Sequence, residues 1–502
     1  MSDYDAIIIG AGLGGLACGA ILAKNGIKTL ICEQANGCGG CCSSMEQDGF
    51  KFDIGPSVVE FKWVWDVLFE KLRRRTSDYI DFIEIDPIYS FITSDGKRFS
   101  YQADLNKTRK TIKMLSEEDA RGWDRFADTG SVMADIFFKS SMFSPMMTVF
   151  DMILFGMKNP MLSFKLKYVF INFESALKSF FKSEAVRSSM GMHAYYLGLP
   201  PALCPGYAVF LCYTDHEGLH YPRGGMVSIP KGIEKAFIEE NGEIRYGEKV
   251  EKIITDGKRA TGVKTASGEE ITANVVISNI NAKTCYLELI GRDKLPRWAV
   301  KAIESYEYSF ANPNLMLGLK GEIELDAHHT VCHSTVDDMN RAWFDYCMKG
   351  KIPDRGFMLL SCPTIEDKSL APENHHCLNI VTVAPYRLSG GKDWDHIREE
   401  YVESRIDIVE KEFRLKLREK IVTAKLNTPK DFERMLLQPE GAIFGLQFDN
   451  MSSMVFRPRI RSGAVKNLYL VGSSTHLGGG TPTVTASGIL AADIIMREKF
   501  NA

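Results

Sequence analysis

One segment near the N-terminus constrains the fold of this chain more than any other. An apolar stretch, residues 6–9, leads directly into a turn at residues 10–15 that reads Gly-Ala-Gly-Leu-Gly-Gly. A helix-like segment follows, with Gly26 at the position of a left-handed helix cap, and a second apolar strand then ends on Glu33. This order of strand, glycine-rich turn, helix, strand and acid predicts a Rossmann-type unit that binds a dinucleotide.

Each part of this unit has a physical task. Gly10 makes the tight turn, Gly12 lets the backbone approach a pyrophosphate, and Gly15 allows the helix to pack on the strand. The N–H groups at the start of the helix can donate to phosphate, and Glu33 can accept hydrogen bonds from an adenosine ribose. The residues of this unit that we predict to bind the cofactor are Gly10, Gly12, Leu13, Gly14, Gly15 and Glu33.

The composition excludes several other classes of protein. The 502-residue chain is 45% hydrophobic and 25% charged, with a formal net charge of −3, so it lacks the basic field of a nucleic-acid-binding protein. No secretory or transit peptide is visible at the N-terminus, and 12 cysteines without such a signal indicate a reducing compartment. We therefore expect a cytoplasmic protein with no nucleic-acid partner. The sequence does not indicate its oligomeric state.

Apolar and lysine-rich segments in the middle of the chain leave its relation to membranes open. The chain has no run of about 18 uncharged apolar residues, so we expect no membrane-spanning helix. The most apolar segment, 140–157, is interrupted by Pro145 and Asp151, and the next segment, 161–183, mixes Phe, Leu and Ile with lysines. Such a mixture either lies on a membrane surface or lines a buried cavity rich in Met and Phe. A peripheral membrane contact therefore stays an alternative to a purely cytoplasmic location.

Different parts of the chain carry different patterns of secondary structure. A long, helical and aromatic-rich stretch spans residues 62–215. Residues 242–279 alternate apolar and polar side chains around glycine-containing turns at 256–257 and 267–268, which predicts two β-hairpins. Residues 286–430 mix strands with a charged helix.

The C-terminus returns to a strand, a turn and a helix. A short apolar strand ends on Gly472, and three consecutive glycines, 478–480, let the backbone pass close to a flat or bulky group. Thr481 is a good N-cap and Pro482 suits the first helical position. The positive end of such a helix could stabilise negative charge on a reduced flavin ring, although an ordinary terminal helix would show the same pattern. The residues of this unit that we predict to bind the cofactor are Gly472, Ser473, Gly480, Thr481, Pro482, Thr483 and Val484.

Six segments of the chain, taken in order, resemble the FAD-dependent family of phytoene desaturases, carotenoid isomerases and retinol saturases. They are the glycine-rich N-terminal unit and residues 37–60, 220–233, 275–284, 440–462 and 468–482. The resemblance implies an FAD cofactor and an α/β fold of the two-domain, amine-oxidase-like type. Because nucleotide-binding patterns occur at both chain ends, we expect a discontinuous Rossmann-type FAD-binding domain with an inserted α+β substrate domain that faces an apolar substrate or a membrane. The expected boundaries are 1–75, 220–285 and 435–502 for the first domain and 76–219 and 286–434 for the second.

The same resemblance implies further cofactor-binding residues. In this family the segment Tyr-Pro-x-Gly-Gly-Met looks like a wall of the flavin site, and Val250 occupies a position similar to one whose backbone contacts adenine. The cofactor contacts implied in this way are Gly39, Gly40, Cys41, Gly55, Pro56, Gly224, Gly225, Met226 and Val250.

One departure from the family pattern leaves the branch of the family open. Desaturases of this family commonly have Gly-Gly-Arg after the ribose-binding acid, with the arginine facing the FAD phosphates, whereas this chain has Gly39-Gly40-Cys41. That sequence is more similar to retinol saturases and carotenoid isomerases. In contrast, Phe-Asp-Ile-Gly-Pro at residues 52–56 is more similar to desaturases.

Several single residues admit both a functional and a structural interpretation. His476 lies in the predicted flavin loop, where it either exchanges protons with the substrate or forms part of the wall. Cys38 and Cys41 form a C-x-x-C pattern typical of redox or metal sites. However, no second cysteine pair has zinc spacing and close approach to a flavin explains the intervening glycines, so we predict no metal site.

Other polar residues are expected to be structural. We expect His193 to line a cavity and Asp53 to serve a cap or turn near the flavin. The residues expected in solvated or surface loops are Arg457, Arg459, Arg461 and the His-His pairs at 328–329 and 375–376.

These observations favour an FAD-dependent oxidoreductase that acts on C–C or C=C bonds of a long apolar isoprenoid or polyene, by desaturation, isomerisation or saturation. Such chemistry needs little from side chains, because the flavin exchanges hydride while a dry cavity holds the substrate. Two enzyme alternatives on the same scaffold are an amine oxidase and a fatty-acid isomerase. An alternative of another class is a non-catalytic prenyl-binding escort-type protein, against which the intact glycine motif and Glu33 argue.

Overall fold

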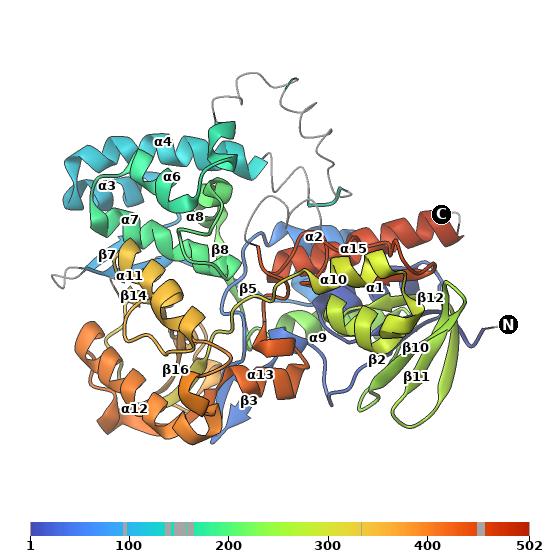
Figure 1. Ribbon diagram of the computed structural model, residues 1–502. Coiled ribbons are helices and arrows are strands. Elements are labelled where there is room, and N and C mark those ends of the chain that lie inside the picture. Colours follow the sequence, from blue (N-terminus) through green and yellow to red (C-terminus); the bar gives the residue numbers. More distant parts are fainter. Residues whose placement is uncertain are drawn as a thin grey trace.

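The computed structural model describes residues 2–93, 98–135, 142–144, 157, 165–332, 334–448 and 457–500. Two seven-stranded sheets and a group of helices make up most of this part of the chain (Figure 1). Most of the apolar segment 140–157 lies outside the described residues. Within the ranges that are described, no helix is both long and apolar enough to cross a bilayer.

The first sheet combines strands from three distant parts of the chain. Its order is β10-β11-β12-β1-β2-β9, and β18 pairs with β12. The pairs β1–β2, β1–β12 and β12–β18 are parallel, as in a Rossmann-type unit. The strands are β1 (Tyr4–Ile9), β2 (Thr29–Cys32), β9 (Glu243–Arg245), β10 (Val250–Asp256), β11 (Arg259–Thr265), β12 (Glu270–Ser278) and β18 (Leu468–Leu470).

Helix α1 (Leu13–Lys24) packs against both α9 (Ser228–Glu239) and α15 (Thr481–Ile495). Residues 13–23 of α1 are all buried, as expected for a helix enclosed on every side. Glycines permit this close packing. A Cβ at Gly15 would lie 2.4 Å from the carbonyl oxygen of Gly10, and a Cβ at Gly488 would lie 2.2 Å from that of Gly14. The first and last helices of the chain are therefore in backbone contact.

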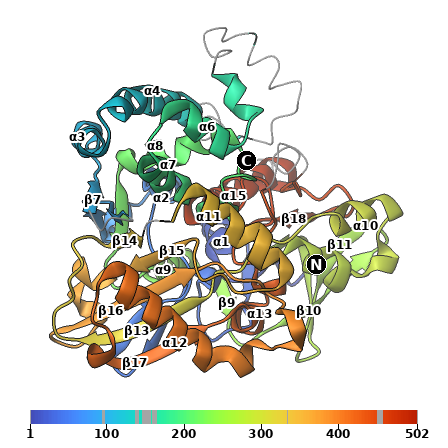
Figure 2. The same ribbon diagram turned by 60° about the vertical axis from the view of Figure 1, so that its left-hand side comes forward.

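The second sheet has the order β17-β13-β16-β15-β14-β6-β7. On β13, Leu315, Leu317 and Leu319 pack in one cluster with residues of α12 (Trp394–Phe413), whereas Met316 belongs to the large central cluster. Figure 2 shows α12 alongside β13, β16 and β17. The strands are β6 (Tyr89–Ile92), β7 (Arg98–Tyr101), β13 (Asn314–Lys320), β14 (His329–Cys332), β15 (Met358–Ser361), β16 (His375–Thr382) and β17 (Ile421–Asn427).

A group of helices forms the third part of the structure, at the upper left of Figure 1. On α6, Phe173, Leu177 and Phe180 are buried, so this described part of the lysine-rich segment 161–183 belongs to the core. Membrane contact of the remaining part stays a prediction. The helices are α3 (Leu105–Leu115), α4 (Glu117–Met133), α6 (Phe173–Phe180), α7 (Glu184–Gly191) and α8 (Val209–Thr214).

The prediction of a helical stretch over 62–215 holds only in part, because three strands lie within it as well as helices. Strand β5 (Phe82–Ile85) pairs with β8 (Leu219–Pro222), and β6 pairs with β14 more than 200 residues away. Such partners are set by tertiary contacts that a local pattern does not contain. The remaining elements are β3 (Ser44–Gln47), β4 (Phe50–Asp53), α2 (Trp63–Lys71), α10 (Arg297–Glu304), α11 (Val336–Arg341) and α13 (Pro429–Leu436).

Other expectations can be compared with the structure directly. The α/β fold class with a discontinuous Rossmann-type domain is confirmed, and the turns at 256–257 and 267–268 join antiparallel strands as predicted. The prediction of Thr481 as N-cap is wrong by one residue: Gly480, with φ of 116°, takes that position and Thr481 is the first helical residue. The proposed boundaries of the two domains stay a prediction.

The two histidine pairs are not in surface loops. His328 and His329 are fully buried where β14 begins, and residues 375–376 begin β16. His329, His375 and His376 belong to strands of the second sheet and His328 directly precedes one, which the sequence pattern around them did not indicate.

We expect Gly488→Val to destabilise the protein by about 1–3 kcal/mol, because the new side chain would overpack the contact between α15 and α1. Urea unfolding of the FAD-loaded protein measures the change. Gly463→Ala is a control with an expected effect within about 0.5 kcal/mol, since its Cβ would meet nothing nearer than 3.9 Å. Equal stability of the Gly488→Val variant and the wild type would contradict the helix contact.

Candidate functional site

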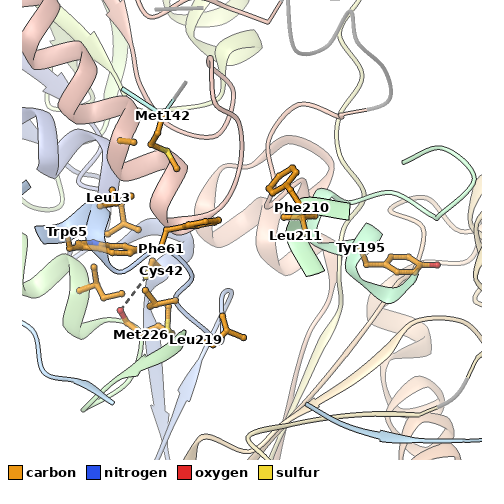
Figure 3. Packing of buried hydrophobic residues seen from close by; sticks show 14 of the residues in the cluster. Leu13, Cys42, Phe61, Trp65, Met142, Tyr195, Phe210, Leu211, Leu219 and Met226 are labelled. Carbon is orange, nitrogen blue, oxygen red and sulfur yellow. Dashed lines mark hydrogen bonds between the residues drawn. The ribbon is translucent and has the colours of Figure 1, made fainter. Parts of the chain in front are cut away.

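A cavity of about 1190 Å³ lies where the first sheet, the second sheet and the helical group meet. Its wall includes the β1–α1 turn, the start of α15 and side chains of η6 (Met192–Leu197) and α8. Figure 3 shows Leu13, Cys42 and Met142 on one side of the view and Tyr195, Phe210 and Leu211 on the other. All six residues line this cavity.

The glycine-rich turn forms one end of the cavity. Gly10, Gly12 and Leu13 line the wall, and a Cβ at Gly12 would lie 2.7 Å from Nδ2 of Asn279. Gly14 and Gly15 do not line it. They permit close packing instead, since a Cβ at Gly14 would lie 3.1 Å from the Val484 carbonyl oxygen. The backbone of the turn is therefore exposed to the cavity on one side and packed tightly on the other.

Glu33 follows β2 and lies beside this turn. Its carboxylate accepts hydrogen bonds from the backbone N–H groups of Ala11 (2.7 Å) and Ala35 (2.8 Å). The side chain is nearly buried, yet it lines the cavity together with Val250. The acid is thus held by the loops on either side of it, at the position where a ribose would be bound.

The C-terminal unit supplies the wall that adjoins this turn. Gly472, Ser473, Gly480 and residues 481–484 all line the cavity, so the N-terminus of α15 points into it. Packing against the protein itself also requires glycine at two of these three positions, which the sequence did not reveal. A Cβ at Gly478 would lie 1.9 Å from the ring of Phe448, and a Cβ at Gly479 would lie 2.8 Å from the Phe444 carbonyl oxygen.

The segment Gly224-Gly225-Met226 does not line the cavity but lies directly behind its wall. The N–H of Gly224 donates to Asp367 (2.6 Å) and the N–H of Met226 donates to Asp53 (2.8 Å). Val227, the next residue, is a lining residue. The role of this segment as a flavin wall stays a prediction.

Asp53 is the last residue of β4 and is buried, and it is neither a helix cap nor part of a turn. Its carboxylate accepts hydrogen bonds from the hydroxyls of Tyr221 (2.6 Å) and Ser44 (2.9 Å) in addition to the Met226 N–H. Its backbone carbonyl accepts from the amides of Asn314 (3.2 Å) and Asn379 (3.1 Å) on the second sheet. Burial raises the pKa of Asp53, and its three side-chain hydrogen bonds oppose that shift.

Gly39, Gly40, Cys41, Gly55 and Pro56 line the cavity between these walls. A Cβ at Gly55 would lie 2.4 Å from the Cys41 carbonyl oxygen. Cys41 is a free thiol, as is Cys38, and burial raises the pKa of each to about 12. These thiols are therefore protonated and weakly nucleophilic near neutral pH.

The described residues fit an FAD cofactor. The turn at Gly12 presents backbone without a side chain, and the N-termini of α1 and α15 face the same cavity, where their dipoles favour negative charge. Lys231 and Lys249 also line the cavity and have no ion pair among the described residues. The sequence analysis missed these two lysines. They supply positive charge to a cavity in which Cys41 replaces the arginine that is common in desaturases.

His476 lines the cavity, and its Nε2 atom is buried with no hydrogen-bond partner among the described residues. Burial lowers the pKa of His476 to about 4, so the imidazole is neutral at pH 7. Arg457 lies nearby. The prediction that it is solvated is wrong, because it is 2% exposed and donates to the carbonyls of Leu446 (2.7 Å) and Ser473 (2.8 Å). A catalytic role for His476 stays a prediction.

A buried polar cluster adjoins the apolar part of the cavity, and the sequence analysis missed it. His193 does not line the cavity as expected; it is fully buried and its Nε2 lies 2.9 Å from Oδ2 of Asp215. The hydroxyls of Tyr89 and Tyr196 lie 2.5 Å apart. Glu60 lines the cavity beside this cluster. Burial and the nearby Asp215 raise the pKa of Glu60 to about 8.

Comparison with known proteins agrees with this geometry. A family model for flavin containing amine oxidoreductase matches residues 13–375. The chain is 28% identical to the lycopene-forming phytoene desaturase of Pseudescherichia vulneris, covering 98% of this chain and 99% of that protein. It is 29% identical to the 4,4'-diapolycopene-forming 4,4'-diapophytoene desaturase of Methylomonas sp, covering 98% and 95%. A putrescine oxidase structure matches with a TM-score of 0.64 at 16% identity, covering 98% and 99%, which shows the fold alone. The predicted family resemblance is confirmed.

We expect Gly12→Ala to weaken FAD binding at least tenfold, because a methyl group would lie 2.7 Å from Nδ2 of Asn279 and shift the turn whose backbone must approach the cofactor. Flavin absorbance that remains with the protein after gel filtration measures retention. Gly37→Ala is a matched control, since Gly37 also lines the cavity but nothing lies within 4 Å of its Cβ position. Full FAD content in the Gly12→Ala variant would contradict this placement.

Glu60→Gln should flatten the dependence of stability on pH. The folded-state pKa of about 8 lies above the ordinary value, so the stability that the protonated side chain contributes is complete below about pH 4 and is lost as pH rises towards 8. Between these values the free energy of unfolding should fall by about 1.4 kcal/mol for each pH unit. Urea unfolding at pH 5 and pH 8 measures it, with Glu288→Gln as the control. Parallel behaviour of the wild type and Glu60→Gln would contradict the assigned environment.

Proposed function

The chain belongs to the family of flavin-containing amine oxidoreductases and is a flavin-dependent oxidoreductase, and we propose that it acts on C–C or C=C bonds of a long apolar isoprenoid or polyene. The proposed reaction is desaturation, isomerisation or saturation. One observation carries the proposal: a single cavity connects the glycine-rich turn to a wall of aromatic and aliphatic side chains. The relatives named for phytoene and 4,4'-diapophytoene support the class of substrate.

The cofactor end of the cavity has the residues that FAD requires. Gly10, Gly12 and Leu13 would face the pyrophosphate, Glu33 the ribose, and residues 481–484 the flavin ring. When bound, FAD supplies a ring that takes a hydride from a substrate carbon or gives one to it. In this proposal, the residues that face FAD are supported from behind by Gly14, Gly15 and the segment 224–226.

The apolar end of the cavity would bind and orient the substrate. Tyr195 stacks on Phe357 with ring centroids 4.6 Å apart, and Phe210 and Leu211 complete an apolar surface. These side chains exclude water and hold a C–H or C=C bond in one orientation, which is the main contribution a protein makes to such a reaction. His476, neutral and without a hydrogen-bond partner on Nε2, is the proposed proton acceptor or donor.

An amine oxidase on the same scaffold would require aromatic rings whose faces are open to a cationic amine. Phe448 lines the cavity near the C-terminal glycines, but the guanidinium of Arg457 lies 4.0 Å from its ring centroid. That face of the ring is already occupied by a cation. Phe448 is therefore a poor candidate for a ring of an amine-binding cage.

The proposal is tested by anaerobic incubation of the FAD-loaded protein with phytoene, prolycopene, retinol and linoleate, with the flavin oxidised or reduced. Chromatography should show conversion of at least one of the isoprenoid or polyene substrates. Conversion of linoleate alone would support a fatty-acid isomerase instead. Recovery of all four compounds unchanged under both conditions would overturn the proposal.

We expect Leu211→Trp to lower kcat/KM at least tenfold while FAD content and the flavin spectrum stay unchanged, because the larger side chain would fill the substrate end of the cavity. Leu211→Met conserves volume and should retain most of the activity. Turnover with the substrate that the wild type converts best measures both variants. Loss of flavin from the tryptophan variant would show that Leu211 lies near the cofactor instead.

A further inference from the structure

Glu60 is held in the wall of the cavity by the backbone on either side of it. Val59 forms a two-way β-bridge with His220, with hydrogen bonds of 2.8 Å and 2.9 Å. Phe61, on the other side, has a left-handed φ of 52° and packs in the core beside Trp65 (Figure 3). Because both neighbours are buried, Glu60 cannot turn away to bulk solvent without disturbing them.

Among the carboxylates that line the cavity, Glu60 differs from the others in its contacts. Glu33 and Glu433 accept hydrogen bonds from protein groups. Glu46, Glu251 and Glu288 are exposed to solvent. Glu60 is not exposed in this way, and its carboxyl group has no hydrogen bond or ion pair with any residue that the structure describes. Among the described surroundings, water or a ligand in the cavity is therefore the partner open to this half-buried carboxyl group.

The groups around Glu60 do not supply a counter-charge. His193 Nδ1 lies 2.9 Å from the Met190 carbonyl oxygen, which can only accept, and its Nε2 lies 2.9 Å from Asp215. With a proton on both nitrogens, His193 forms a neutral ion pair with Asp215. Among the described residues, the other titratable groups that interact with Glu60 are the hydroxyls of Tyr89 and Tyr196. The environment therefore favours a neutral carboxyl group.

A pure hydrocarbon would be a poor ligand for this part of the cavity. On binding it would exclude water from the half-buried Glu60 and leave its carboxyl group without a partner, which costs about 1–3 kcal/mol on scales derived from proteins. A hydroxyl group would instead accept from and donate to the protonated carboxyl at the same time.

We propose that Glu60 determines substrate specificity by hydrogen bonding to an alcohol group, so that the preferred substrate is a hydroxylated isoprenoid or polyene rather than a hydrocarbon. This inference rests on the proposed function, since it assumes that the cavity binds a long apolar molecule. It adds that one part of this molecule is polar and lies against Glu60.

The test compares binding of all-trans-retinol with binding of the hydrocarbon that has a methyl group in place of its hydroxymethyl group. Perturbation of flavin absorbance in the FAD-loaded protein reports binding without turnover. The wild type should bind the alcohol at least tenfold more tightly than the hydrocarbon. Glu60→Gln should keep most of that preference, because an amide also donates and accepts. Glu60→Leu should abolish it, mainly by weakening alcohol binding.

A matched control and the contrary outcomes separate this inference from the proposed function. Glu288→Leu removes an exposed carboxylate from the same cavity and should leave the preference unchanged. Equal affinities of the wild type for the two ligands, or an undiminished preference in Glu60→Leu, would overturn the role of Glu60 while leaving the apolar cavity intact. Failure of both ligands to bind any variant would overturn the proposed function and this inference with it.

Discussion

The contact between the first and last helices is the constraint on which the site depends. α1 and α15 approach so closely that the carbonyl oxygen of Gly14 occupies the space of a side chain at Gly488. Both helices begin at the cavity, so their N-terminal N–H groups and dipoles converge on one region. A side chain at either glycine would separate the helices and divide that region. Two segments about 470 residues apart in the chain thus form one end of the cavity.

The two ends of the cavity differ in chemistry in a way that suits a dinucleotide and an apolar ligand. Helix N-termini, Lys231 and Lys249 lie at one end, and Tyr195, Phe210 and Leu211 lie at the other. A charged phosphate gains nothing at the aromatic end, and a hydrocarbon gains little among the lysines. The orientation of both ligands is therefore set before any specific hydrogen bond forms.

Local patterns were sufficient for the elements that hold the cofactor end. The order of strand, glycine turn and helix around Gly12, the two hairpins of the first sheet and the terminal helix after Gly480 are all encoded in short stretches, and the structure contains each of them. The elements that the sequence did not predict depend on distant partners. Strand β6 exists because β14 pairs with it, and Ser57 meets His329 across 272 positions of chain (2.9 Å). Arg457 resembled a solvated residue because the carbonyl groups that surround it belong to other loops. The sequence analysis also missed Glu60, because only the fold shows that its carboxyl group lines the cavity without a hydrogen bond to any described residue.

The bonds of Asp53 have a mechanical consequence. Its carboxylate is bonded to Tyr221 and Met226, and its carbonyl is bonded to Asn314 and Asn379 of the second sheet. Asp53 therefore joins the segment behind the cavity wall to the second sheet by hydrogen bonds. The second sheet and the segment around Met226 cannot separate along this seam without breaking several buried hydrogen bonds at once. The width of the cavity along this seam is therefore held by hydrogen bonds among residues that lie outside its wall.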